Sequence, residues 1–363
     1  MSIRVVSIAA AGLCAAAVFS TALSSAGAEP AKVALPGLSI DAEKVTVSGI
    51  SSGAFMGNQF HVAHSDLVSG AGLVAGGLYS CATTIVTGDN IVGTASRALD
   101  RCMFETAPLS SLNRYTGYAE DFAKRGWIAD TENLKGDKVY LFSGRADTTV
   151  KTATVELAAD FYDHFDADVD LLTKLPDSDL RAAHSFVTKD WGNPCSEQGS
   201  PFINDCKYDQ AGAIFQLLYE GANQAAANPA SIISFDQTPY TDGDPKDISM
   251  WDTGYAYIPD SCKAEGADCG LHVAFHGCQQ SAQTIGDDFY TKIGLNEWAE
   301  GTGTVVLYPQ ARSVENFFNP FAANPKGCWN WWGYTMDNRF PVRDGQQIAA
   351  VRKMVDQIMS AAR

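Results

Sequence analysis

Positive charge is scarce in this chain of 363 residues. Asp and Glu number 42 against 26 Lys and Arg, which gives a formal net charge of −16 at neutral pH. Nucleic acids and anionic membranes attract proteins of the opposite charge, so general electrostatics disfavours both as partners. We therefore expect a partner that is neutral, or solid and uncharged.

Long apolar runs are missing beyond the first residues, and none reaches the length of about 18 residues that crosses a bilayer. The N-terminal segment has a different pattern. Arg4 precedes an apolar stretch at 5–22, and the sequence AGA at 26–28 forms an A-x-A cleavage site. This pattern is typical of a secretory signal peptide. We expect residues 1–28 to be removed, and 29–363 to form a single catalytic domain that is secreted or periplasmic.

The paired C-x-x-C spacing of zinc sites is also missing, so we expect no metal and no cofactor. Residues 29–363 contain eight cysteines, and an even number in an exported chain predicts disulfides. Eight cysteines allow many connectivities, but bridges between near neighbours close the shortest loops. This favours the pairs Cys81–Cys102, Cys195–Cys206, Cys262–Cys269 and, by elimination, Cys278–Cys328.

Apolar, β-type runs alternate with helical segments along the chain, without internal repeats or a Pro- or Ser-rich linker. Such alternation predicts βαβ units and a mostly parallel sheet with helices on both faces. The expected strands are 45–50, 71–75, 139–142, 271–275 and 305–308. The expected helices are 54–64, 154–165, 210–220, 280–300 and 346–359. The range 236–269, rich in Asp, Pro and Gly, is expected to be an excursion from the core.

The sequence GISSG at 49–53 lies between the expected strand 45–50 and the expected helix 54–64. A G-x-S-x-G on a strand-to-helix turn is the nucleophile elbow of α/β-hydrolases, in which the tight turn exposes the serine at the top of the sheet. In a chain with 32 glycines the pentapeptide alone is a weak signal, and a Gly/Ser surface turn is the alternative. Its setting favours an α/β-hydrolase fold with Ser51 as the nucleophile.

The order of the parts differs from that of an ordinary α/β-hydrolase. There the oxyanion-loop strand precedes the elbow, whereas here the corresponding strand, 271–275, follows it near the end of the chain. Joining Met359 back to Val45 would restore the usual order. Because the termini of compact domains lie at the surface and often close together, such a rearrangement is physically tolerable. We therefore expect a circular permutation.

A serine nucleophile needs a general base and a carboxylate that orients it, both at the carboxyl ends of later strands. Asp147 follows the expected strand 139–142 on a Gly-led loop and is the candidate acid; the alternative is a turn aspartate that caps the next helix. His184 follows in the right order and is the candidate base by exclusion. The other histidines lie in expected helices, or in the strand 271–275 and its end: His61, His64, His164, His272 and His276.

An oxyanion hole needs two N–H donors. The N–H of Ser52, next to the nucleophile, is one candidate. The loop after strand 271–275 begins with His276 and Gly277, and the N–H of Cys278 is the second candidate. For His276 we favour a packed ring that holds this loop by a hydrogen bond over a catalytic role.

Four aromatic residues are concentrated just after Cys328, and such clusters ordinarily belong to a core. A bridge from Cys278 to Cys328 would instead place them beside the oxyanion loop, where an aromatic wall suits an apolar ester chain. We expect a substrate-binding wall made of Trp329, Trp331, Trp332 and Tyr334.

Five motifs are specific in combination. They are GISSGAFM at 49–56, VAGG at 74–77 with Tyr79 and Cys81, HGCQQ at 276–280, YPQ at 308–310, and GCWNWWGY at 327–334. Together they resemble the circularly permuted single-domain poly(3-hydroxybutyrate) depolymerases. The resemblance implies a secreted α/β-hydrolase that cleaves polyesters of 3-hydroxybutyrate. It makes Ser51 the nucleophile, Asp147 the acid and His184 the base, with Ser52 and Cys278 as oxyanion donors and Trp329 in the substrate wall.

Two rival functions stay open. One is another secreted carboxylesterase, of the feruloyl or acetyl-xylan esterase type, and the other is a catalytically inactive binding protein. The triad candidates argue against the second, and the permuted order with the aromatic segment argues against the first. Because no linker or separate polymer-binding domain is visible, amorphous polymer or hydroxyalkanoate oligomers are better expected substrates than crystalline polymer. We expect a monomer that binds neither nucleic acid nor membranes.

Overall fold

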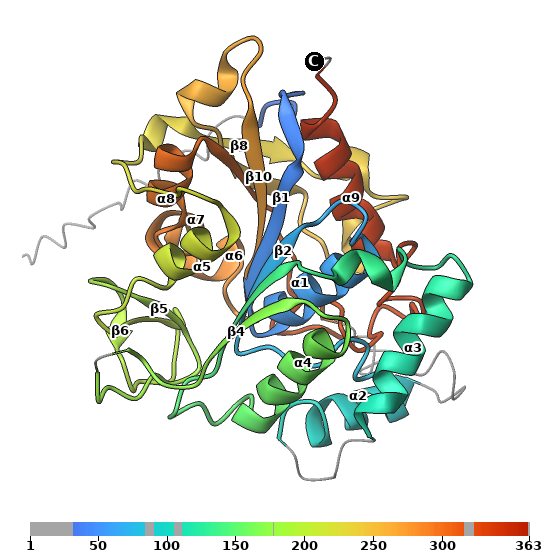
Figure 1. Ribbon diagram of the computed structural model, residues 1–363. Coiled ribbons are helices and arrows are strands. Elements are labelled where there is room, and N and C mark those ends of the chain that lie inside the picture. The colour runs from blue at the N-terminus through green and yellow to red at the C-terminus, as the bar shows by residue number, and fades with distance from the viewer. Residues whose placement is uncertain (1–31, 84–90, 105–110, 177, 316–322, 362–363) are drawn as a thin grey trace, which may run out of the picture. The chain divides into compact units, whose positions relative to one another are not determined.

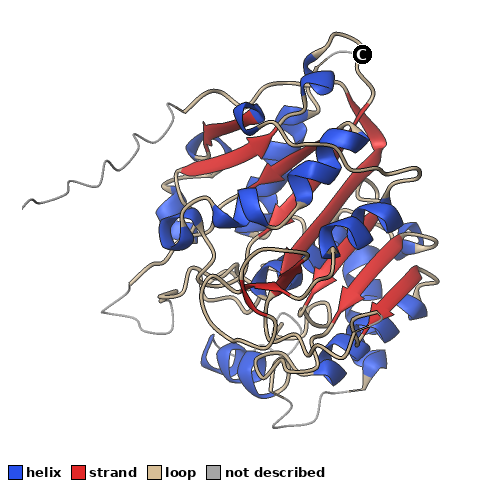
Figure 2. Cartoon of the chain, turned by 90° about the vertical axis from the view of Figure 1, so that its left-hand side faces the viewer, coloured by secondary structure: helices blue, strands red, loops and turns tan. Residues whose placement is uncertain are grey.

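The computed structural model describes residues 32–83, 91–104, 111–176, 178–315 and 323–361. The predicted signal peptide at 1–28 lies outside these residues. A sheet of eight strands runs through the structure, with helices packed on both of its faces (Figure 1, Figure 2). No helix in the described part of the chain is both long and apolar enough to span a membrane.

The order of the strands across this sheet differs from their order along the chain. From one edge to the other, the strands are β4 (Asp168–Leu172), β3 (Lys138–Phe142), β2 (Gly70–Val74), β1 (Ile40–Ile50), β10 (Cys269–Phe275), β11 (Thr304–Tyr308), β9 (Thr253–Tyr257) and β8 (Ile232–Asp236). All pairs from β4 to β11 are parallel, and the pairs β11–β9 and β9–β8 are antiparallel. The predicted mostly parallel sheet is confirmed.

Side chains alternate between the two faces of each strand, and each face is covered by its own layer of helices. In β3, Val139 and Leu141 belong to one apolar cluster, and Tyr140 and Phe142 to the other. The first cluster includes side chains of α1 (Ser52–Ala63), α2 (Ile91–Asp100), α3 (Leu112–Lys124), α4 (Thr152–His164) and α9 (Gln346–Ile358). The second includes side chains of α5 (Gln210–Leu218), α6 (Ala282–Ile285), α7 (Asp288–Lys292) and α8 (Leu295–Thr302) (Figure 1).

Shorter elements complete the described chain. A small parallel sheet consists of β5 (Phe186–Thr188), β7 (Ile203–Asp205) and β6 (Asn193–Pro194). Short 3-10 helices are η1 (Thr131–Leu134), η2 (Pro229–Ser231), η3 (Thr238–Tyr240), η4 (Pro245–Ile248) and η5 (Asp260–Lys263).

Two expectations about elements are wrong. The range 280–300 is not one helix but the three pieces α6, α7 and α8, because Gly286 and Gly294 adopt positive φ angles of 64° and 88°, which end a helical path. The range 236–269 is not an excursion, because it contains β9, which pairs with β11 and β8 within the main sheet.

The strand that carries the elbow, β1, lies between β2 and β10, which come from opposite parts of the chain. The segment before β1 also meets the end of α9, since the N–H of Leu38 donates to the carbonyl of Ile358 at 2.6 Å. Rejoining the chain at this point is therefore geometrically simple. The circular permutation itself stays a prediction.

Four disulfides join the pairs Cys81–Cys102, Cys195–Cys206, Cys262–Cys269 and Cys278–Cys328. This is the pairing that the near-neighbour argument predicts.

Candidate active site

The elbow places Ser51 at the junction of β1 and α1, with backbone angles of φ 56° and ψ −123°. A non-glycine residue rarely occupies this region, and such strain is concentrated at functional sites. The turn tolerates no side chain at its two glycines. A Cβ on Gly49 would lie 2.3 Å from the carbonyl oxygen of Gly53, and a Cβ on Gly53 would lie 2.2 Å from that of Phe275. The N–H of Ser51 donates to the carbonyl of Val74 at 2.9 Å, which fixes the turn against β2.

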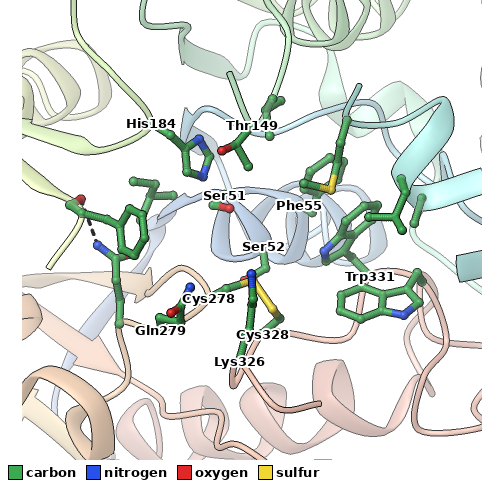
Figure 3. A pocket seen from close by; sticks show the side chains of 18 of the residues that line it. Ser51, Ser52, Phe55, Thr149, His184, Cys278, Gln279, Lys326, Cys328 and Trp331 are labelled. Atoms are coloured by element: carbon green, nitrogen blue, oxygen red, sulfur yellow. Dashed lines mark hydrogen bonds between the residues drawn. A yellow bond between two sulfur atoms is a disulfide. The ribbon is translucent and has the colours of Figure 1, made fainter. Parts of the chain in front are cut away.

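Asp147 and His184 form a close pair beside this serine. The Nδ1 of His184 lies 2.7 Å from Oδ2 of Asp147. The second carboxylate oxygen, Oδ1, accepts hydrogen bonds from the N–H groups of Thr149 and Val150 at 2.7 and 2.9 Å. Both side chains are buried. With Nδ1 held by the carboxylate, the other ring nitrogen of His184 is left for a partner in the cavity, where Figure 3 shows the ring next to Ser51.

The Asp147 loop is tied to the loop closed by the Cys195–Cys206 bridge. Thr148 Oγ1 donates to the side-chain oxygen of Gln198 at 2.6 Å, and the Gln198 amide donates to Thr149 Oγ1 at 2.9 Å. Gln198 could not be identified from the sequence, because no local pattern relates it to the acid loop far before it in the chain.

A second strand end supplies the oxyanion loop, residues 276–280 after β10. His276 donates from Nδ1 to the carbonyl of Gly277 at 2.7 Å and accepts at Nε2 from the N–H of Ala311 at 3.0 Å. Complete burial lowers the pKa of His276 to about 4, so the ring is neutral near pH 7. The predicted role of His276 as a packed ring that holds this loop is confirmed.

The peptide between Gly277 and Cys278 is oriented by these contacts. Its carbonyl faces His276, and because a trans peptide is planar its N–H points the other way. Gln280 adds a second anchor, since its side-chain oxygen accepts from the N–H of Gly277 at 2.8 Å and its amide donates to the carbonyls of Pro201 and Phe202. No acceptor among the described residues takes a hydrogen bond from the N–H of Cys278.

These groups open onto a cavity of about 570 Å³. Ser51, Ser52, His184 and Cys278 line it (Figure 3). The rest of the lining is mostly apolar or uncharged: Phe55, Ala98, Leu99, Met103, Phe104, Val150, Phe202, Trp331 and Trp332 contribute, with Asn, Gln and Thr side chains between them.

The aromatic segment is divided between cavity and core. Trp331 and Trp332 line the cavity, and Trp331 stacks on Phe55 with ring centroids 4.0 Å apart. The expectation that Trp329 lines the cavity is wrong, because its side chain has no exposed surface and packs edge-on against Phe275. Tyr334 is equally buried, and its hydroxyl donates to the carbonyl of Cys328 at 2.7 Å. A compact turn after the disulfide directs these two rings inward.

The remaining histidines lie away from the cavity. His61 is buried between Asp137 and Tyr162, with Nε2 3.0 Å from the carboxylate of Asp137. His272 lies in β10 between the hydroxyls of Thr46 and Ser48. His64 is buried at the end of α1, and His164 is partly exposed in α4. Among the described cavity-lining residues, His184 is therefore the one histidine.

No cluster of three or more metal-ligating side chains occurs among the described residues.

No family model matches the chain. It is 38% identical over 353 residues to a poly(3-hydroxybutyrate) depolymerase of Delftia acidovorans, and this alignment covers 95% of the chain but 66% of that relative. It is 34% identical over 350 residues to a polyhydroxybutyrate depolymerase of Talaromyces funiculosus, covering 92% of the chain and 94% of the relative.

Two solved structures have the same fold. One is a PHB depolymerase carrying a serine-to-alanine substitution and complexed with an R3HB trimer, with a TM-score of 0.77. The other is the PHB depolymerase from Penicillium funiculosum, with a TM-score of 0.74. Both are 32% identical to the chain, and each match covers 90% of the chain and 99% of the solved structure. The predicted α/β-hydrolase fold is thereby confirmed. The chain belongs to the poly(3-hydroxybutyrate) depolymerase family.

Proposed function

We propose that this protein is a secreted serine esterase that hydrolyses poly(3-hydroxybutyrate) or its oligomers. The observation that carries the proposal is the His184–Asp147 pair, which adjoins Ser51 on a strained elbow at the wall of a mostly apolar cavity. The names of the relatives, and the R3HB trimer complexed with a structural neighbour, support this substrate class.

The chemistry follows from the positions of these groups. His184 takes the proton of the Ser51 hydroxyl at Nε2 while the serine oxygen attacks the ester carbonyl, and Asp147 stabilises the imidazolium that forms. The N–H groups of Ser52 and Cys278 stabilise the negative oxygen of the tetrahedral intermediate. When the C–O bond breaks, His184 returns the proton to the leaving alkoxide, and an acyl-Ser51 ester remains. Water, deprotonated by His184, then releases the carboxylic acid and restores Ser51.

Apolar surface in the cavity suits the methyl and methylene groups of a polyester. Trp331, Trp332 and Phe55 provide this surface next to the oxyanion loop. Burial of apolar area contributes roughly 25 cal/mol per Å², so a long chain gains more from such a wall than a small ester does. We assign the substrate wall to these residues rather than to Trp329 or Tyr334.

Export and assembly belong to the same proposal. Four disulfides are consistent with an oxidising compartment, either the periplasm or the medium, after removal of residues 1–28. We propose a monomer without cofactor, metal, nucleic acid or membrane partners.

A product assay tests the function. Purified mature protein is incubated in parallel with amorphous poly(3-hydroxybutyrate), with 3-hydroxybutyrate oligomers and with a feruloyl ester, and the released acids are quantified by chromatography. We expect 3-hydroxybutyric acid or its short oligomers from the first two substrates. Hydrolysis of the feruloyl ester alone would favour the rival esterase, and no hydrolysis at all would favour an inactive binding protein.

A further inference from the structure

The cavity contains one feature that hydrolysis of a neutral polyester does not require. Lys326 is the only Lys, Arg, Asp or Glu among the described residues that line it. The chain as a whole carries 42 acidic against 26 basic residues, yet among the described residues no acid lines this cavity and a single cation does. Within the described part of the chain, no carboxylate forms an ion pair with this ammonium group.

The position of Lys326 is fixed relative to the oxyanion loop. Its carbonyl accepts a hydrogen bond from the N–H of Gln279 at 2.7 Å. Two residues further on, Cys328 is bridged to Cys278, with a Cα–Cα distance of 4.2 Å. Between them, the N–H of Gly327 donates to the carbonyl of Asn324 at 3.1 Å and closes a tight turn. Two connections therefore hold the backbone of Lys326 beside the proposed oxyanion donor.

The side chain itself is exposed and extends from this turn toward the cavity (Figure 3). An ammonium group at such a place attracts a carboxylate. The interior of a polyester chain offers none, but each free oligomer has one at its carboxyl end. In a hydroxyalkanoate chain, the alkoxy side of every ester leads toward that end. The carboxylate therefore belongs to the segment that leaves as the alcohol.

We propose that Lys326 is a specificity-determining residue that binds the terminal carboxylate of short 3-hydroxybutyrate oligomers. The inference rests on the proposed function and narrows it, because it makes free-acid oligomers preferred substrates over uncharged chains of the same length. Cleavage is then directed to ester bonds near the carboxyl end. Lys326 also offsets, at the cavity, the repulsion that a protein of net charge −16 exerts on an anionic substrate.

Two substrates of equal length isolate the effect of the terminal carboxylate. They are the 3-hydroxybutyrate trimer as free acid and the same trimer as methyl ester. Their kcat/KM values are measured for the wild type and for Lys326→Met. The hydrogen bond from Gln279 is made to the backbone, so the substitution retains it. We expect the ratio of free acid to methyl ester to fall about fivefold in the variant, mainly through KM, as for a partly exposed ion pair. The same ratio in the wild type should fall with added salt.

Lys246→Met is the matched control, because Lys246 is exposed, lies outside the cavity lining and carries the same charge. The ratio should be unchanged in this control and restored in Lys326→Arg. An unchanged ratio in Lys326→Met, or an equal fall of the ratio in Lys246→Met, would overturn the inference. The proposed function would still stand in that case, provided that the wild type hydrolyses both trimers. If the wild type cleaved neither trimer, the proposed function itself would fail.

Discussion

His184 is oriented by a hydrogen bond at Nδ1 and by the edge-on ring of Phe202. Asp147 binds Nδ1, and the carboxylate is in turn held by the N–H groups of Thr149 and Val150. This leaves the other ring nitrogen as the available acceptor for a proton from Ser51. Catalysis in the proposed mechanism therefore depends on a chain of short hydrogen bonds that begins in the backbone of the acid loop.

Replacement of the general base, His184, tests this series of hydrogen bonds. We expect His184→Ala to lower kcat for a soluble ester by about three orders of magnitude or more, because no other group removes the proton of Ser51. The measurement is steady-state hydrolysis of a p-nitrophenyl ester, with folding checked by circular dichroism. The partly exposed His164 provides a control, and His164→Ala should retain full activity. A His184→Ala enzyme with more than a tenth of wild-type turnover would remove this residue from the mechanism.

Substitutions of Trp329 and Trp331 are expected to affect different properties, stability for the first and substrate binding for the second. Trp329 is fully buried against Phe275, so Trp329→Ala should lower the free energy of unfolding by about 3–5 kcal/mol. Trp331 lines the cavity and stacks on Phe55, so Trp331→Ala should depress hydrolysis of polymer more than that of a short ester. Urea denaturation and paired activity assays measure both effects. Trp331 is itself only 5% exposed, so its loss can also lower stability. An equal fall of polymer and short-ester hydrolysis in Trp331→Ala would contradict its place in the substrate wall.

Sequence alone could not assign these rings correctly. In a strand or a helix, periodicity indicates which side chains face inward, but the segment 329–334 is a loop without a fixed period. Its direction is set by long-range contacts, such as the bond from the N–H of Asn330 to the side chain of Gln347. Ser51 and Asp147, by contrast, follow recognisable strands, and His184 could be selected by exclusion from its order along the chain.

At the scale of elements, the buried central strands were predictable and the edge strands were not. A strand buried on both faces is a nearly continuous apolar run, as in β10 and β11. The edge strand β4 reads Asp-Val-Asp-Leu-Leu and is partly exposed, so its signal is weak. The edge strand β8 ends, and its neighbour β9 lies, in a region whose Asp, Pro and Gly content suggested an irregular structure.

The Cys278–Cys328 bridge joins two loop segments, the oxyanion loop and the aromatic segment. We expect the double variant Cys278→Ser/Cys328→Ser to lose both stability and kcat, because the loop that presents the N–H of Cys278 loses its covalent anchor. The control is Cys262→Ser/Cys269→Ser, which removes a bridge outside this loop and outside the cavity lining. It should lower the melting temperature, since a bridge contributes roughly 2–4 kcal/mol, and leave kcat unchanged. Equal losses of kcat in both variants would contradict a special role for the first bridge.

At the scale of the whole molecule, buried neutral histidines predict sensitivity to acid. Burial lowers the pKa of His64 and His272 to about 3 and that of His276 to about 4, from an ordinary value of 6.5. These histidines have lower pKa values in the folded protein than in the unfolded chain. Below pH 6.5 the unfolded chain binds protons that the folded protein does not bind, so the free energy of unfolding falls as the pH falls. Above pH 6.5 this loss is absent. At pH 5.5 each of the three histidines lowers the free energy of unfolding by about 1.4 kcal/mol, and together they lower it by about 4 kcal/mol.

Urea denaturation at pH 7.5 and 5.5 measures this loss. The expected result is a clearly smaller free energy of unfolding at pH 5.5. Equal free energies at both pH values would show that the three buried rings do not contribute in this way.

For the whole molecule, we claim that Ser51 on its strained elbow is the nucleophile that opens a polyester of 3-hydroxybutyrate. The most direct measurement compares acid release from amorphous poly(3-hydroxybutyrate) by the wild type and by Ser51→Ala. We predict steady release by the wild type, and a rate lower by several orders of magnitude in a variant whose melting temperature is preserved. Release by a folded Ser51→Ala protein at more than a tenth of the wild-type rate would contradict the claim.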